Sequence, residues 1–257
     1  MENTPKYDVL IKSSIKDYVK LKYVINSLRF LNPQPSKIFL INPDGFKPNN
    51  TEYDSIIVTV MDKDVFPNCD VNNIKFKPKY WCFASLMAVF QDVTEQKFYL
   101  DVQSDNFFIK PINLFNNDNK PIFFISPQYK DFHKAYFNFS KQMSSIERIG
   151  GDSFMINFVM YNKDISKEML IPYGNFDGYF KKACEIINDK CYPADQEIYP
   201  NWCLKTHNGL YDIQKNVIVK IMGKHYPLNY TEQEIENEIN KMYNEEKAIS
   251  LHTWAQI

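Results

Sequence analysis

Glycine is scarce in this sequence, with only 7 in 257 residues, and no glycine-rich phosphate-binding loop can be built from it. Neither G-x-G-x-x-G nor G-x-x-x-x-G-K-[ST] occurs anywhere in the chain. The glycines of those loops let backbone N–H groups approach the phosphates of a dinucleotide or a nucleoside triphosphate. Their absence argues against a Rossmann NAD enzyme and against a P-loop NTPase.

Long hydrophobic runs are also missing. The amino-terminal residues MENTPKYDVLIKSSIKDY are polar and charged, and they lack the apolar core of a signal peptide. No run approaches the roughly 18 apolar residues that a membrane-spanning helix needs. We therefore expect no membrane span and a cytoplasmic location, which would be the host cytoplasm for a viral protein. The abundance of Asn, Lys and Ile is typical of an AT-rich genome, bacterial or viral.

Paired cysteines and an excess of one charge are absent as well. No C-x-x-C pair occurs, which argues against a zinc ribbon. We expect reduced thiols at all five cysteines, Cys69, Cys82, Cys184, Cys191 and Cys203. The 30 basic and 31 acidic residues give a net charge of −1. This balance removes a global electrostatic case for binding nucleic acid or an anionic membrane, although local patches stay open.

What the sequence does contain predicts an α/β fold. Hydrophobic residues make up 44% of the chain, enough for a sizeable core in one domain. Within the first 110 residues, apolar runs and helical stripes alternate in the order strand, helix, strand, strand, helix, strand, which favours an open α/β sheet. The segments are Tyr7–Lys12, Asp17–Leu31, Lys37–Asn42, Ser55–Val60, Pro78–Phe90 and the run beginning at Lys97.

The second half of the sequence is less regular. It predicts strands at Pro121–Ile125, Ser153–Tyr161, Val217–Met222 and Ile249–Trp254. It predicts helices at Asp131–Ile146, Ser166–Leu170, Phe176–Asn188 and Thr231–Lys247, the last with a Thr231–Glu234 capping box and a buried stripe of Ile235, Ile239, Met242 and Tyr243. No linker divides the chain, so we expect a single domain over residues 1–257.

Acidic and amide side chains interrupt the segment KFYLDVQSDNFFIKP at Lys97–Pro111. By strand alternation Asp101, Gln103 and Asp105 share one face, and such hard oxygen ligands suit Mg²⁺ or Mn²⁺. A solvated acidic corner between two strands is the other interpretation. Ser13 and Asp44 also follow predicted strands, so they could converge with Asp105 where open sheets bind ligands, or could serve only in turns.

Several segments, in the right order, resemble nucleotide-sugar-dependent glycosyltransferases of the GT-A fold, with the bacterial and viral (phage) members most similar. They are the opening YDVLIKSSIKDYVKLKYVINSLRFL, the helix KYWCFASLMAVF followed by QSDNFFIKPI, the strand region GGDSFMINFVMYNKDISKEML, the segment ADQEIYPN, and the final ISLHTW. The resemblance implies an open, twisted, mostly parallel sheet flanked by helices. It further implies a nucleotide-sugar-binding half at residues 1–112, and an acceptor-binding half with the last helix and strand at residues 113–257.

The resemblance implies transfer of a hexosyl or pentosyl group from a nucleotide sugar to a hydroxyl acceptor, and we expect the donor to be UDP-linked. The acceptor is either a glycan or a hydroxymethylated base in phage-type DNA. A basic patch of Lys16, Lys20, Lys22, Lys75, Lys77 and Lys79 would favour DNA if those segments were adjacent. The alternatives are a catalytically silent relative that binds a sugar nucleotide or glycan and, with less support, a metal-dependent phosphohydrolase.

The resemblance also implies a Mn²⁺ or Mg²⁺ site. The family's D-x-D motif falls on Gln103-Ser104-Asp105, so its first acid is an amide here. Asp105 matches the position that bridges metal and diphosphate, and His252 matches the family's terminal histidine ligand. Asp101 could substitute for the missing acid only if the strand bends. His252 could instead be an ordinary residue of the last strand.

The remaining candidates concern the donor and the acceptor. We expect the donor to contact Lys12, Ser13, Asp44, Trp81, Gln103, Ser104, Asp105, Arg148 and Lys224. An inverting enzyme needs a carboxylate to take the acceptor's proton. Asp195 and Glu197 match the family's acidic cluster, and Asp152 is a third choice, although a carboxylate at a helix start can simply cap N–H groups. A retaining enzyme needs no protein base.

Overall fold

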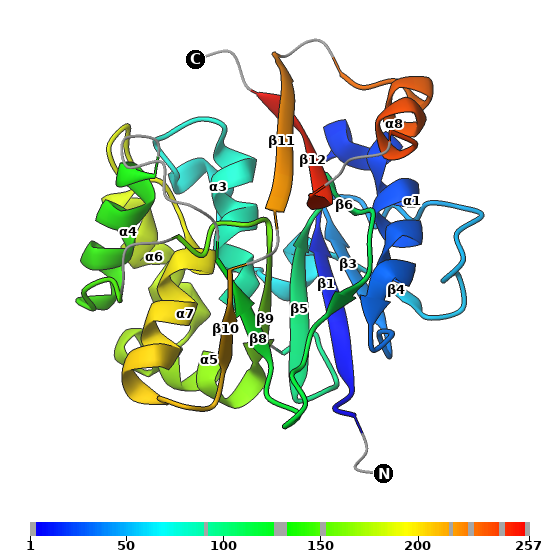
Figure 1. The fold of residues 1–257 in the computed structure, drawn as a ribbon. Coiled ribbons are helices and arrows are strands. Elements are labelled where there is room, and N and C mark those ends of the chain that lie inside the picture. Colours follow the sequence, from blue (N-terminus) through cyan, green and yellow to red (C-terminus); the bar gives the residue numbers. More distant parts are fainter. Residues whose placement is uncertain are drawn as a thin grey trace.

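A five-stranded sheet forms the centre of the molecule in the computed structural model, which describes residues 4–89, 92–125, 133–149, 153–215, 218–225, 229–241 and 245–254 (Figure 1). The strand order is β4-β3-β1-β5-β9. All neighbours are parallel except β9, which runs antiparallel to β5. The mostly parallel α/β sheet predicted from the sequence is therefore confirmed. Its strands are β1 (Tyr7–Lys12), β3 (Ile38–Asn42), β4 (Ile57–Met61), β5 (Phe98–Gln103) and β9 (Phe158–Asn162).

Helices cover both faces of this sheet. Helix α1 (Tyr18–Ser27) follows β1, and its buried residues pack in one hydrophobic core with Val9 and Ile11. Helix α3 (Lys79–Leu86) precedes β5, and its buried residues pack in the other core with Leu10. This alternation arises because successive strand side chains point to opposite faces, and it explains why β1 is apolar at nearly every position.

The strand order reverses between β1 and β5. From β1 the chain runs to β3 and β4 on one side and then crosses to β5 on the other side of β1. In open α/β sheets, ligands bind outside the carboxyl ends of the strands at such a switch point. The residues that follow Lys12 and Gln103 are therefore the candidates for ligand binding.

A second, three-stranded sheet lies at the carboxyl end of the central strands (Figure 1). Its order is β11-β12-β6, with β11 (Ile218–His225) parallel to β12 (Glu246–Trp254) and β6 (Asn106–Phe108) antiparallel to β12. Because β6 begins just after the turn that ends β5, this sheet brings β12 next to the switch point.

Shorter elements complete the fold. The remaining strands are β2 (Leu31–Asn32), β7 (Ile112–Asn113), β8 (Ile122–Phe124) and β10 (Asp212–Gln214). The remaining helices are η1 (Ile15–Asp17), η2 (Leu28–Phe30), α2 (Asp62–Val65), η3 (Val71–Asn73), η4 (Met87–Val89), α4 (Lys134–Ser144), α5 (Lys163–Leu170), η5 (Ile171–Tyr173), α6 (Phe176–Ile186), α7 (Asp195–Thr206) and α8 (Glu232–Ile239). None of the helices in the described ranges has the length and apolar character needed to cross a bilayer.

Two predicted elements depart furthest from the structure. The strand predicted from Ser153 begins only at Phe158, because Asn157 has a φ of 71° and the backbone N–H of Phe154 donates to Glu197 instead of to a sheet. The last helix ends at Ile239 instead of Lys247, since Glu246 already belongs to β12. Its capping box is confirmed and Ile235 is buried, whereas Met242 and Tyr243 lie outside the described residues.

Candidate functional site

Asp105 and His252 meet at the switch point although 147 residues separate them in the sequence. Asp105 lies in the turn between β5 and β6, and His252 lies on β12. The distance from Asp105 Oδ2 to His252 Nδ1 is 2.9 Å, and the N–H of Leu251 donates to the carbonyl oxygen of Asp105 at 2.9 Å. The other carboxylate oxygen, Asp105 Oδ1, is buried and has no hydrogen-bond partner among the described residues.

Positive charge surrounds the Asp105 carboxyl. Burial raises its pKa, but the His252 ring together with Lys20 and Lys16 outweighs burial and holds the pKa below its usual value. The group is therefore an anion at neutral pH, with one oxygen on His252 and the other unsatisfied. A buried polar atom without a partner is uncommon in a folded protein and marks a place where a ligand or ion can bind.

A divalent cation fits this pair in part. Asp105 supplies a hard oxygen and His252 a ring nitrogen, both of which bind Mn²⁺. No group of three or more His, Cys, Asp or Glu side chains able to hold a metal occurs in the described part of the chain. Protein ligands at this position would thus number two, and a bound diphosphate and water would have to supply the remaining oxygens.

Asp101 and Lys12 are engaged with each other instead of with Asp105. Strand β5 ends at Gln103 and the chain turns at Ser104, so the strand alternation that would align Asp101 with Asp105 is interrupted. The Asp101 side chain is 1% exposed, and its Oδ1 accepts a hydrogen bond from Lys12 Nζ in a buried ion pair.

Ser104 and Ser13 lie on either side of the switch point. Ser104 Oγ donates to Asp17 Oδ2 at 3.1 Å, and the same carboxylate accepts hydrogen bonds from Ser14 Oγ and Lys20 Nζ, each at 3.1 Å. Ser13 Oγ is buried without a partner among the described residues. Neither Asp17 nor Lys20 was predicted from the sequence as a residue of this site. The available signal was Lys20 itself, a lysine on the otherwise apolar stripe of α1 and fully buried in the structure.

Asp44 follows β3, the strand beside β1, so it lies at the same carboxyl edge as Ser13 and Asp105. It accepts a hydrogen bond from the Tyr18 hydroxyl, whose pKa is raised by burial and by Asp44. The Tyr18 ring stacks on Phe46 with a centroid distance of 4.0 Å and an interplanar angle of 7°. Ser13, Asp44 and Asp105 thus follow the ends of β1, β3 and β5, which are neighbouring strands of the central sheet, and their contact with a donor stays a prediction.

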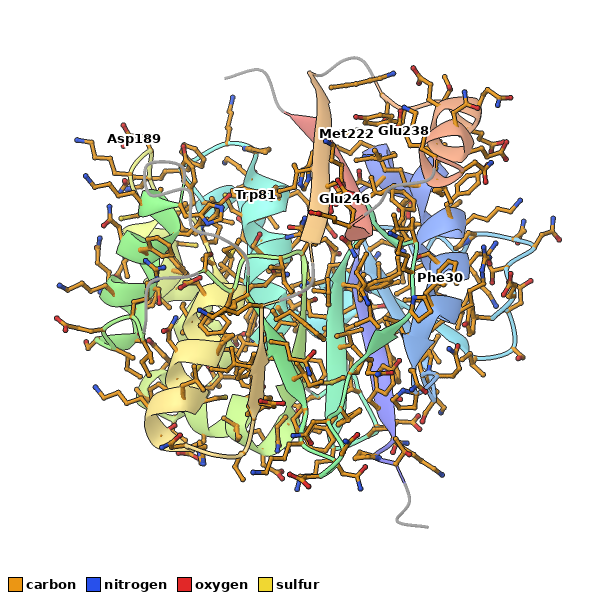
Figure 2. The ribbon with its side chains drawn as sticks, viewed as in Figure 1. Phe30, Trp81, Asp189, Met222, Glu238 and Glu246 are labelled. Atoms are coloured by element: carbon orange, nitrogen blue, oxygen red, sulfur yellow. The ribbon has the colours of Figure 1, made fainter. Side chains whose placement is uncertain are left out.

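Three other donor candidates have partners within the protein. Trp81 lies on α3, which Figure 2 shows to one side of β11 and β12, and its ring packs edge-on against Tyr192 at 6.2 Å. The Arg148 guanidinium lies 3.9 Å from the Phe137 ring centroid, and its Nε is 3.6 Å from Glu197 Oε1. Lys224 forms an ion pair with Glu234 on α8.

The two described base candidates are buried at the start of α7. Asp195 accepts a hydrogen bond from the Tyr179 hydroxyl, and burial raises its pKa well above the usual value. Burial also raises the pKa of Glu197, which accepts hydrogen bonds from Ser153 Oγ at 3.1 Å and the Phe154 N–H at 3.0 Å. Their side chains attach α7 to α6 and to the segment that precedes β9. Asp152, the third candidate, lies outside the described residues.

Comparisons with known proteins give matches among solved structures. No family model and no curated protein matches the sequence. Among solved structures, an active-site mutant of LgtC, a GT-A glycosyltransferase, is similar over 95% of this chain and 86% of that chain, with a TM-score of 0.47 and 11% sequence identity. A similarity at this level supports no conclusion about the activity of this chain, so its function has to be argued from the site.

Proposed function

We propose that this chain is a nucleotide-sugar-dependent glycosyltransferase with a GT-A-like fold, which transfers a hexosyl or pentosyl group from a UDP-linked donor to a hydroxyl group. The observation that carries the proposal is the Asp105–His252 pair, with the unsatisfied Asp105 Oδ1, at the switch point of the sheet. A charged ligand bound through a cation would satisfy that oxygen, and a nucleotide diphosphate is such a ligand.

Glycosyl transfer needs positive charge at the leaving group. As the bond between the anomeric carbon and the diphosphate breaks, negative charge gathers on the phosphate oxygens. A bound Mn²⁺ or Mg²⁺ would stabilise that charge as a Lewis acid. Asp105 and His252 would hold the cation, and Lys20 and Lys16 add to the positive field that already acts on Asp105. The amide of Gln103, in place of a carboxylate, leaves this site with one negative charge fewer.

The surroundings of the base candidates favour transfer with retention of configuration. Neither Asp195 nor Glu197 is accessible to an acceptor, since their exposed fractions are 1% and 0%. Burial also raises the pKa of Asp195 well above its usual value, which disfavours the carboxylate form that a base needs. In a retaining reaction the acceptor's proton can pass to the leaving phosphate, so no protein base is required.

A glycan is the acceptor that this arrangement favours. The six lysines that would favour DNA divide between η1–α1 and the segment entering α3, and these helices pack on opposite faces of the sheet. Lys20 is also fully buried, so it cannot belong to an exposed basic patch. Together with a net charge of −1, this gives a hydroxymethylated DNA base less support than a sugar chain.

A thermal-shift panel of nucleotide sugars, each with and without Mn²⁺, tests the proposal. A ligand that binds only the native state at 100 times its Kd adds about 2.7 kcal/mol of stability. We expect one donor to raise the melting temperature only with metal. A shift without metal would mean that Gln103 has displaced metal chemistry, and a flat panel would refute the proposal. Slow hydrolysis of the bound donor distinguishes an enzyme from a catalytically silent binding protein, which should leave the donor intact.

His252→Ala is expected to weaken Mn²⁺ affinity by about 10- to 100-fold and to reduce turnover, because a metal position loses its only nitrogen ligand. Metal titrations at a fixed donor concentration measure the change. His207→Ala is the matched control. His207 lies at the end of α7, away from β12, and its ring pairs with Glu168. An unchanged metal dependence in His252→Ala would reassign His252 to a purely structural role.

A further inference from the structure

Asn157 has an unusual backbone conformation for a buried residue. Its φ is 71°, in the left-handed region that most side chains avoid and that Asn tolerates better than most. The other non-glycine residues with positive φ in the described ranges are Asn50, Asn119 and Ser145, and none of these is buried. A left-handed non-glycine residue costs about 1–2 kcal/mol, so the surrounding contacts must hold Asn157 in place.

Three hydrogen bonds hold it, and they reach three segments that are distant in sequence. The Asn157 backbone N–H donates to Gln196 Oε1 at 3.2 Å, at the start of α7. Its carbonyl oxygen accepts from the Gln103 N–H at 3.0 Å, at the end of β5. Its side-chain Nδ2 donates to Ser250 Oγ at 2.7 Å, on β12.

Two of these contacts flank the proposed cation ligands. Gln103 precedes Asp105 by two residues, and Ser250 precedes His252 by two residues on the same face of β12. Ser250 Oγ also donates to Asn106 Oδ1 at 2.9 Å, just after Asp105. The turn that carries Asp105 is therefore attached to Asn157 on both sides, directly through Gln103 and indirectly through Ser250.

We propose that Asn157 is a positioning residue that sets the separation of Asp105 and His252 for a divalent cation bound to a nucleoside diphosphate. This inference rests on the proposed function. The left-handed conformation lets the N–H, the C=O and the side-chain amide of one residue point to three different segments, which an extended strand residue could not do.

The side-chain amide is specifically required. The Ser250 hydroxyl has one proton, which it donates to Asn106, so it needs a donor from the other side. Asn157 Nδ2 supplies that donor. Glycine would keep the backbone conformation without strain but would lose the link to β12.

Asn157→Gly, compared with the wild type and Asn119→Gly, tests the proposal. Asn119 has a φ of 60° in an outlying turn, so its substitution makes the same backbone change away from the site. Calorimetric titration with UDP in the presence and absence of Mn²⁺ measures affinity, and the urea unfolding midpoint measures stability. We expect Asn157→Gly to weaken Mn²⁺-dependent UDP binding by about tenfold with little change in the unfolding midpoint. Asn119→Gly should leave the affinity unchanged.

Ser250→Ala provides a second test, because it removes the same link from the β12 side. If Asn157 acts through Ser250, the double variant Asn157→Gly/Ser250→Ala should bind no more weakly than the poorer single variant. Wild-type affinity in Asn157→Gly, or fully additive losses in the double variant, would overturn the positioning role. Failure of the wild type itself to bind UDP or any nucleotide sugar would overturn the proposed function and this inference with it.

Discussion

Asp105→Ala is expected to weaken Mn²⁺-dependent binding of the donor by about 10²–10³-fold while the chain stays folded. The substitution removes the carboxylate that the proposed site offers to a cation. The fold should tolerate it, because the Asp105 side chain makes its hydrogen bond to His252 alone and its Oδ1 has no partner among the described residues. Calorimetric titration of the donor, with and without Mn²⁺, measures the loss.

Asp189→Ala is a suitable control for that experiment. Figure 2 shows Asp189 at the left edge of the molecule, away from the β12 strand that begins at the labelled Glu246. The control should bind the donor as the wild type does. Wild-type donor affinity in Asp105→Ala would remove Asp105 from the site and leave its contact with His252 as a structural hydrogen bond.

Lys12→Met is expected to destabilise the protein by about 3–5 kcal/mol, because it leaves the buried Asp101 carboxylate without its charged partner. Both side chains of this ion pair are almost fully buried, with exposed fractions of 4% and 1%. Urea unfolding, followed through the intrinsic fluorescence of the tryptophans, measures the change in the free energy of unfolding.

The double variant Lys12→Met/Asp101→Leu should recover much of that loss, since an apolar pair of similar volume avoids the desolvation of both charges. Donor affinity should stay at the wild-type level in the double variant. A stable Lys12→Met protein with reduced donor affinity would contradict this and return Lys12 to the donor site that its place at a strand end predicts.

The central strands could be predicted from the sequence because strands buried on both faces are apolar at nearly every position. YDVLIK predicts β1 with the bounds observed, and Ser13 and Ser14 mark its end. The same reasoning failed at Ser153–Phe158, where an apolar run looks like a strand. The side chain of Glu197, more than forty residues away, accepts the hydrogen bonds of that segment, and no local pattern contains this information.

The candidate site could likewise be predicted only in part. Asp105 and His252 could be chosen from the order of motifs, and the structure places them in contact, whereas their role as ligands stays a prediction. The pairing of Lys12 with Asp101 could not be foreseen. It depends on the parallel register of β1 and β5, which sets Leu10 opposite Asp101 and Lys12 opposite Gln103. The contacts of Asn157 could not be predicted from the sequence either, because its partners come from β5, α7 and β12.

The contact between Asp105 and His252 closes a loop of 147 residues. Closing a loop of that size costs conformational entropy, so a contact of this kind forms late in folding. A ligand that bridges the two side chains would act as a reversible cross-link between β12 and the central sheet. Donor binding would then slow hydrogen exchange along β12 and β6. The exchange rate of β12 would therefore measure occupancy of the site as directly as turnover does.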